Sequence, residues 1–148
     1  MQINVEKIYE TLLSNHPSSK NQVVVEVGAH RLKQSIFAAK LGFTVKTVDA
    51  SPQNFAIMEG EYDRLDGDTK KLISLHHNAA GARSNEVVTF SAIGGTGDHV
   101  TPPSATLDAG KAKYDKAENS GMVEVKTLAL DDLIEKADGN VFLLKIDT

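Results

Sequence analysis

Two carboxylates beside a glycine turn are the residues of this chain best suited to ligand chemistry. Glu26 and Gly28 belong to the segment Glu-Val-Gly-Ala-His at 26–30, and Asp49 follows about 20 residues later. A carboxylate only accepts hydrogen bonds and can take the protons of two vicinal hydroxyls, while glycine lets a ligand approach the backbone closely. At this spacing a second-strand acid meets the ribose in nucleotide-binding βαβ units. The pattern therefore predicts a nucleotide-type ligand.

The residues that follow Gly28 bear on which nucleotide could bind. A dinucleotide-binding turn has the pattern G-x-G-x-x-G, whereas positions 29–33 read Ala-His-Arg-Leu-Lys and lack both later glycines. The chain also has no G-x-x-x-x-G-K-[ST] motif, which argues against ATP or GTP hydrolysis. A nucleoside without phosphates is the better candidate, and this points to S-adenosylmethionine. Two alternatives stay open: the glycine and the acids are only part of a parallel α/β architecture, or the chain is an NAD-dependent oxidoreductase without the usual glycines.

These residues must be held at strand ends, and the hydrophobic pattern predicts such strands. The nearly continuous β-branched run at 23–27 is typical of a strand covered on both faces. Short connections between alternating helices and strands require right-handed crossovers and give a parallel sheet. In order, the expected elements are a helix over 5–13, the strand over 23–27, a short helix ending at Gly42, a strand over 44–48, a helix over 51–65 and a strand over 72–76.

The second half of the chain has a different pattern, in which two strands are expected to pair as a hairpin around a long loop. The expected elements are strands over 87–90 and 123–127, the loop over 93–121 between them, a short helix opening at Leu130 and ended by Gly139, and a last strand over 141–146. The predicted fold class is α/β, with a Rossmann-like, doubly wound, mostly parallel sheet and an inserted β-hairpin.

We expect a single domain over 1–148, in which 1–20 form an N-terminal helix and a linker. The strand over 141–146 is apolar, and the chain stops soon after it. An exposed, flat, hydrophobic edge is prone to association. Either self-association through this strand covers it, or the chain is the front part of a longer protein, truncated after its central strand. The second interpretation is the preferred one.

Composition places the chain among ordinary globular proteins and excludes several classes of function. Of its 148 residues 41% are hydrophobic and 24% are charged, and the net charge of −4 gives no general attraction to nucleic acid or anionic membranes. Because the chain has no Cys, thiolate catalysis and Cys-ligated zinc are excluded. We expect no metal site, since His76 and His77 point to opposite faces of a strand. The lack of a signal-peptide pattern and of an apolar run of about 18 residues predicts a cytoplasmic protein.

Five sequence elements, in the right order, resemble the FkbM-type branch of the S-adenosylmethionine-dependent methyltransferases. They are Glu-Val-Gly-Ala-His-Arg-Leu at 26–32, Asp-Ala-Ser-Pro-Gln-Asn-Phe at 49–55, Asn-Ala-Ala at 78–80, Leu-Asp-Asp-Leu at 130–133 and Leu-Lys-Ile-Asp at 144–147. Two residues depart from the family pattern: His30 replaces the usual Asn, and Leu32 replaces a second glycine that lines the methionine part of the cofactor. The family's sheet also continues beyond its Lys-Ile-Asp segment, and that part is absent here.

The resemblance implies S-adenosylmethionine as cofactor and gives a role to each matching residue. Glu26 and Gly28 would lie near the methionine end, Asp49 on the ribose hydroxyls, and Asn78 and Ala79 beside the adenine. The remaining members of the implied cofactor-binding set are Ala29, His30, Ala50 and Asn54.

Asp147 is the candidate catalytic residue, because the resemblance implies that it faces the transferred methyl group. Methyl transfer depends mainly on aligning acceptor oxygen, methyl carbon and sulfur, and a general base helps when the acceptor is a hydroxyl. The expected activity is O-methylation of a small molecule or saccharide. His30 is a distant second candidate base and is more simply a turn residue. A non-catalytic S-adenosylmethionine-binding module or fragment is the alternative function.

Overall fold

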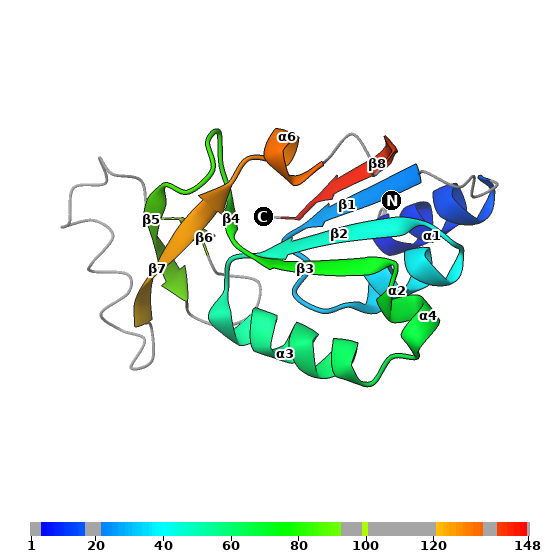
Figure 1. Cartoon of the computed structure of the whole chain (residues 1–148), viewed down its shortest axis with the longest axis horizontal. Helices are drawn as coiled ribbons and strands as arrows, with labels where there is room; N and C mark the ends of the chain where they lie inside the picture. The colour runs from blue at the N-terminus through cyan, green and yellow to red at the C-terminus, as the bar shows by residue number, and fades with distance from the viewer. Residues whose placement is uncertain (1–3, 17–21, 93–98, 101–120, 135–138, 148) are drawn as a thin grey trace.

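The computed structural model describes residues 4–16, 22–92, 99–100, 121–134 and 139–147, which form an α/β fold with two four-stranded sheets (Figure 1). The predicted linker after the first helix and most of the predicted loop over 93–121 lie outside these ranges. No helix in the described ranges is long and apolar enough to cross a membrane.

The first sheet is entirely parallel, as the alternation of helices and strands predicts, and its strands lie in the order β3-β2-β1-β8. Its strands are β1 (Gln22–Val27), β2 (Thr44–Asp49), β3 (Ile73–His77) and β8 (Asn140–Ile146). The register pairs Val27 with Val48 and with Ile146, and it pairs Asp49 with His77. The carboxyl ends of all four strands therefore meet at one edge of the sheet.

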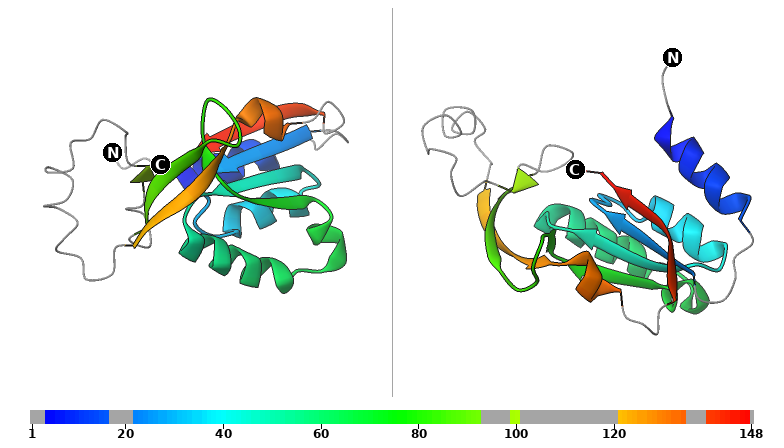
Figure 2. Two further views of the ribbon diagram at one scale, coloured as in Figure 1. Left: turned by 60° about the vertical axis from the view of Figure 1, so that its left-hand side comes forward. Right: turned by 90° about the horizontal axis from the view of Figure 1, so that it is seen from above.

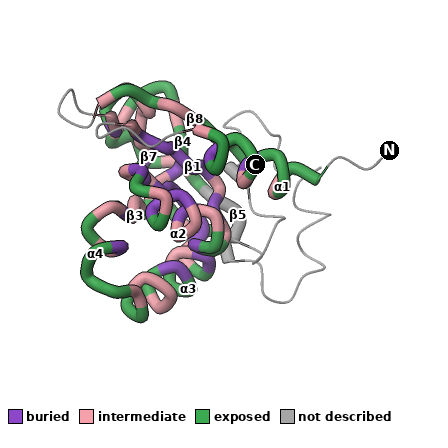
Figure 3. Tube along the Cα trace, turned by 90° about the vertical axis from the view of Figure 1, so that its right-hand side faces the viewer, coloured by how far each residue is buried: buried purple, intermediate pink, exposed green. Residues whose placement is uncertain are grey.

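Four helices cover one face of this sheet: α1 (Val5–Ser14), α2 (Lys33–Lys40), α3 (Pro52–Asp63) and α4 (Gly67–Lys70). The first and third begin as the sequence predicts, since the Asn4 side chain accepts from Lys7 N and the Ser51 hydroxyl accepts from Asn54 N. The core on this face packs Leu13, Val24 and Phe43 together. Figure 3 shows the buried residues gathered on the central strands and on the inward sides of the helices.

The opposite face has much less cover in the described ranges, where the short helix α6 (Leu130–Leu133) is the element that packs on it. Leu133 contacts a row of valines that includes Val25 and Val48. The outer strand β8 leaves Leu144 and Ile146 exposed on the side of the sheet that bears this row, and Figure 2 shows β8 at the rim of the sheet. Self-association through this strand stays a prediction.

The second sheet replaces the simple hairpin that the sequence predicts, and its strands lie in the order β4-β7-β5-β6. Its strands are β4 (Ala79–Ala80), β5 (Val87–Ala92), β6 (His99–Val100) and β7 (Gly121–Leu128). The expected antiparallel pairing of the two longer strands is confirmed as β5 with β7. Within the predicted loop over 93–121, the described residues differ from a loop, because β6 pairs with β5 there and β7 begins at Gly121.

Some predicted boundaries of the helices are wrong for local reasons. The helix from Pro52 ends at Asp63, because Asp66 caps a separate short helix, α4, by accepting from Thr69 N. The helix at Leu130 ends already at Leu133, since Ile134 has extended backbone. In α1 the apolar residues Val5, Ile8 and Leu12 are exposed, and the buried residues are Tyr9 and Leu13.

Candidate functional site at the carboxyl edge of the sheet

The candidate site lies where the carboxyl ends of the first sheet approach the second sheet. Figure 1 shows strands β1, β2 and β3 pointing toward the second sheet. Ala50, just after β2, packs in one small cluster with Ala79 and Val125. The Asn78 side chain donates from Nδ2 to the carbonyl oxygen of Lys126 at 3.1 Å. The second sheet therefore lies beside the carboxyl ends of β2 and β3.

Asp49, His30 and Asn54 form a connected polar triad at the end of β2. Asp49 Oδ2 accepts from the backbone N–H of His30 at 2.8 Å, and Asp49 Oδ1 accepts from the backbone N–H of Ser51 at 2.9 Å. His30 Nδ1 lies 3.0 Å from Asn54 Oδ1, and Asn54 Nδ2 lies 3.5 Å from Asp49 Oδ1. The sequence predicts all three as ligand residues, and the structure brings them together. Their contacts tie the turn after β1 to the start of α3.

His30 adopts an unusual backbone conformation within this triad. Its φ is 55°, in the left-handed region that Asn and Gly enter more readily than most residues. The hydrogen bonds of its N–H to Asp49 and of its ring to Asn54 hold it there. This agrees with the simpler sequence-based interpretation of His30 as a turn residue, while a catalytic role stays untested.

At this edge of the sheet the backbone of a neighbouring strand requires a glycine at position 28. Its φ is 72°, and a Cβ built on it would lie 2.9 Å from the carbonyl carbon of Asp147 and closer still to the carbonyl oxygen. The end of β8 is fixed there because Asp147 N donates to the Val27 carbonyl at 3.0 Å. The sequence pattern attributes Gly28 to the close approach of a ligand, whereas in the structure the backbone of β8 makes that approach.

Glu26 is fully buried and engaged inside the protein, although the sequence predicts it as a ligand residue. Ser35 Oγ donates to Glu26 Oε2 at 2.6 Å, and Lys145 Nζ lies 3.1 Å from Glu26 Oε1. Burial raises the pKa of the Glu26 carboxyl above its ordinary value, and the bond from Ser35 and the charge of Lys145 partly offset this shift. A direct role of Glu26 toward a ligand stays a prediction.

Lys145 links this buried carboxylate to the candidate base. Its Nζ also lies 3.5 Å from Asp147 Oδ2, and the Lys145 side chain is 11% exposed whereas that of Asp147 is 75% exposed. Asp147 therefore presents an open carboxylate at the sheet edge, with a cation beside it. Sequence reasoning missed Lys145 as a site residue, although a lysine in an otherwise apolar strand is a signal that it needs a buried partner.

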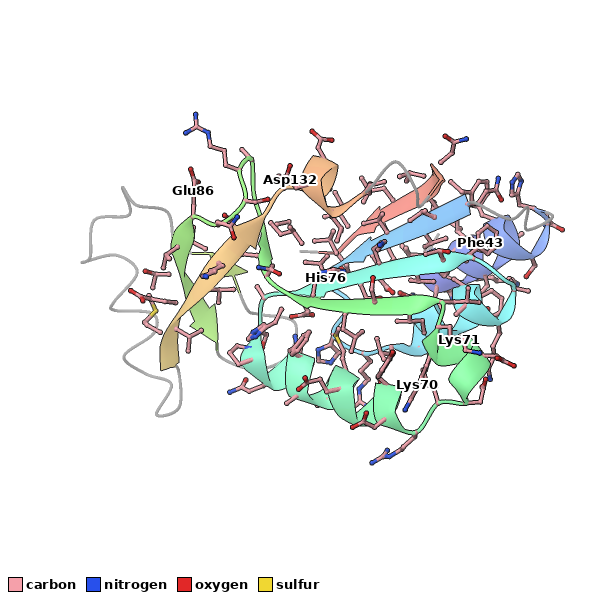
Figure 4. All side chains as sticks on the ribbon, in the orientation of Figure 1. Phe43, Lys70, Lys71, His76, Glu86 and Asp132 are labelled. Carbon is pink, nitrogen blue, oxygen red and sulfur yellow. The ribbon has the colours of Figure 1, made fainter. Side chains whose placement is uncertain are left out.

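An aromatic pair stands at the end of β3. The ring of His77 stacks on that of Phe55 with centroids 4.7 Å apart, and His77 Nε2 donates to the carbonyl oxygen of Ala50 at 3.2 Å. Its neighbour His76, labelled in Figure 4, pairs with Val48 of β2, and successive side chains of a strand lie on opposite faces. Burial lowers the pKa of His76, and the charge of Lys46 adds to this shift. No group of three or more His, Asp or Glu residues able to hold a metal ion occurs in the ranges that the structure describes.

Four backbone N–H groups of the turn after β1, those of residue 28 and of residues 30–32, have partners within the chain. Gly28 N donates to Val48 O at 2.9 Å, and Arg31 N donates to Ala29 O. Leu32 N donates to Glu61 Oε2 at 2.8 Å, so a carboxylate from α3 satisfies the donor just before α2. Nothing in the sequence pattern marks Glu61 for this contact.

Leu32 occupies a core position next to this turn. It is completely buried and packs with Ala29 and Met58, and Ile36 and Phe55 border the same cluster. The departure from the glycine of the resembling family therefore fills space between α2 and α3.

The arrangement combines a buried carboxylate, Asp49, with an exposed carboxylate, Asp147, on the same edge of the sheet. It can accept hydrogen bonds from hydroxyl groups at two points and can take up a proton at the second. Comparison of the chain with protein-family models, with curated proteins and with solved structures gives no match in any of the three.

Proposed function

We propose that this chain binds S-adenosylmethionine at the carboxyl edge of its parallel sheet and is the cofactor-binding part of an FkbM-type, class I methyltransferase fold. The observation that supports this best is the meeting of Asp49, Asn78 and Asp147 at a single sheet edge, on β2, after β3 and after β8. Open α/β sheets bind their ligands outside the carboxyl ends of the strands. The proposed acceptor is a hydroxyl group of a small molecule or saccharide.

Asp49 has the capacity to hold a ribose. Each carboxylate oxygen can accept about two hydrogen bonds, and Asp49 Oδ2 accepts one, from His30 N. One lone pair therefore remains for a ribose hydroxyl. The bond from Ser51 N keeps the carboxylate oriented, so it needs little rearrangement on binding.

The turn after β1 favours a ligand without phosphates over a dinucleotide. A pyrophosphate needs free backbone N–H groups at the start of a helix. Those of Gly28, His30, Arg31 and Leu32 are all engaged within the chain. This supports S-adenosylmethionine over NAD.

Bound S-adenosylmethionine supplies a methyl group made electrophilic by its sulfonium. It would donate this methyl group to the acceptor oxygen and leave as S-adenosylhomocysteine. Asp147 takes the acceptor's hydroxyl proton, and its exposed carboxylate leaves room for an incoming hydroxyl. Lys145, 3.5 Å away, restrains the Asp147 side chain.

Calorimetric titration with S-adenosylhomocysteine tests the proposal. We expect saturable binding that Asp49→Asn weakens about ten- to a hundredfold, the range for a hydrogen bond to a charged group of about 1.5–3 kcal/mol. Asp63→Asn, an exposed acid at the end of α3, is the matched control and should bind as the wild type does. Absence of binding by the folded wild-type chain would refute the proposal.

A non-catalytic S-adenosylmethionine-binding module is the second candidate. The burial of Glu26 and its engagement with Ser35 and Lys145 favour it, because they leave no free acid at the position that the family resemblance assigns to the methionine end. Binding of S-adenosylhomocysteine that Asp147→Asn leaves unchanged, together with no methyl transfer to any hydroxyl acceptor, would select this candidate.

A further inference from the structure

We propose that Glu61 is a specificity residue that excludes phosphate-bearing ligands from the turn after β1. The Glu61 carboxylate lies at the start of α2, where a nucleotide phosphate would bind, and it accepts the hydrogen bond of the backbone N–H group that such a phosphate would use. The inference rests on the proposed nucleoside site and adds the residue that restricts this site to phosphate-free nucleosides.

The position of Glu61 makes it a built-in anion. It reaches from α3 to the turn, where Oε2 accepts from Leu32 N at 2.8 Å and Oε1 lies 3.5 Å from Arg31 Nη1. The helix that follows, α2, has no capping side chain of its own at Leu32. Anions are stabilised at a helix start by unpaired N–H groups and by the helix dipole. Glu61 supplies that anion from within the protein.

A second carboxylate reinforces the exclusion. Asp49 Oδ2 accepts from His30 N, so two acids hold alternate N–H groups of the same turn. Two cations near this turn could neutralise an incoming phosphate, but Arg31 faces Glu61 and Lys33 is paired with Glu6. A phosphate at the N–H groups of His30 and Leu32 would therefore meet two like charges. A neutral or cationic 5′ substituent, such as a sulfonium, meets no such repulsion.

Glu61→Ala tests this by releasing both the Leu32 N–H and Arg31. Glu61→Gln keeps an acceptor for Leu32 N while it removes the charge, so it serves if the alanine variant does not fold. Glu59→Gln is the matched control, since Glu59 is an exposed acid on the same helix. Two measurements are made on each protein: the affinities of adenosine and of AMP by calorimetry, and inorganic pyrophosphate titration followed by the backbone amide shifts of residues 28–32.

We expect wild type and Glu59→Gln to bind adenosine, to disfavour AMP and to show no shifts at 28–32 with pyrophosphate. Glu61→Ala should lower the AMP-to-adenosine ratio of dissociation constants about tenfold, the worth of one hydrogen bond to a charged group, and should show pyrophosphate shifts at Leu32. Glu61→Gln should lower the ratio about threefold, because only the repulsion is removed.

Pyrophosphate shifts at 28–32 in the wild type, or no gain in any folded Glu61 variant, would overturn the inference. The pyrophosphate titration needs no nucleoside site, so it decides the role of Glu61 even if adenosine and S-adenosylhomocysteine both fail to bind. That failure would refute the proposed function alone.

Discussion

Substitution of Gly28 by Ala should destabilise the protein strongly, because the added Cβ lowers the free energy of unfolding in two independent ways. The backbone at Gly28 has φ of 72°, and a left-handed conformation costs a residue with a Cβ roughly 1–2 kcal/mol. The new Cβ would also lie 2.9 Å from the carbonyl carbon of Asp147, and forcing extra atoms into a packed site costs typically about 1–3 kcal/mol. The expected loss is therefore about 2–5 kcal/mol of the free energy of unfolding.

Urea unfolding of Gly28→Ala measures this loss directly, and Gly60→Ala is the matched control. Gly60 lies inside α3, and a Cβ added there would have no atom within 4 Å, so alanine should raise the free energy of unfolding by about 0.5–1 kcal/mol. If Gly28→Ala instead unfolds within about 1 kcal/mol of the wild type and loses only ligand affinity, the end of β8 does not constrain Gly28. The explanation from ligand approach would then be the right one.

Three further predictions concern the buried groups around the site. Because the pKa of Glu26 is raised in the folded state, the free energy of unfolding should fall as pH rises from 4.5 through the raised value. Urea unfolding at several pH values measures this slope, and Glu26→Gln should flatten it. An unchanged slope in that variant would contradict the burial of the Glu26 carboxylate. The pKa of His76 is lowered, so stability should fall as pH drops through 6.5 toward the lowered value, and His76→Gln should remove that loss. Leu32→Ala should cost about 2–5 kcal/mol of unfolding free energy, and a cost below about 1 kcal/mol would show that Leu32 does not fill the core between α2 and α3.

The sequence predicts the parallel sheet and the location of the candidate residues well, because both depend on local patterns. The β-branched run of β1, the Ser-Pro start of α3 and the acid at the end of β2 each specify an element or its end without reference to distant residues. Their meeting at one edge then follows from parallel pairing. The strand order and the register required the structure.

The partners of those residues could not be predicted, because they come from distant parts of the chain. Glu26 and Lys145 are paired across β1 and β8 and are 119 residues apart in sequence. Glu61 reaches Leu32 from another helix, 29 residues away. A spacing pattern shows that Glu26 stands at a strand end, but whether it is open to a ligand depends on which strand lies beside it.

Local sequence patterns also could not predict all strands of the second sheet. Strands β4 and β6 have two residues each, too few for a hydrophobic period, and they exist because β5 and β7 offer them partners. The contact between α6 and the loop that joins β4 to β5 is equally non-local, since Ser84 Oγ donates to Asp132 Oδ2 at 2.5 Å.

Mapping S-adenosylhomocysteine on the protein by backbone amide shifts is the most direct test of a nucleoside site at the carboxyl edge of the sheet. We predict saturable shifts concentrated at His30, Asp49 to Ser51 and Asn78, on the first turns after β1, β2 and β3, with none on the free edge of β8 near Asn140. Saturable shifts confined to any other surface, or no shifts from a folded chain at saturating ligand, would contradict it.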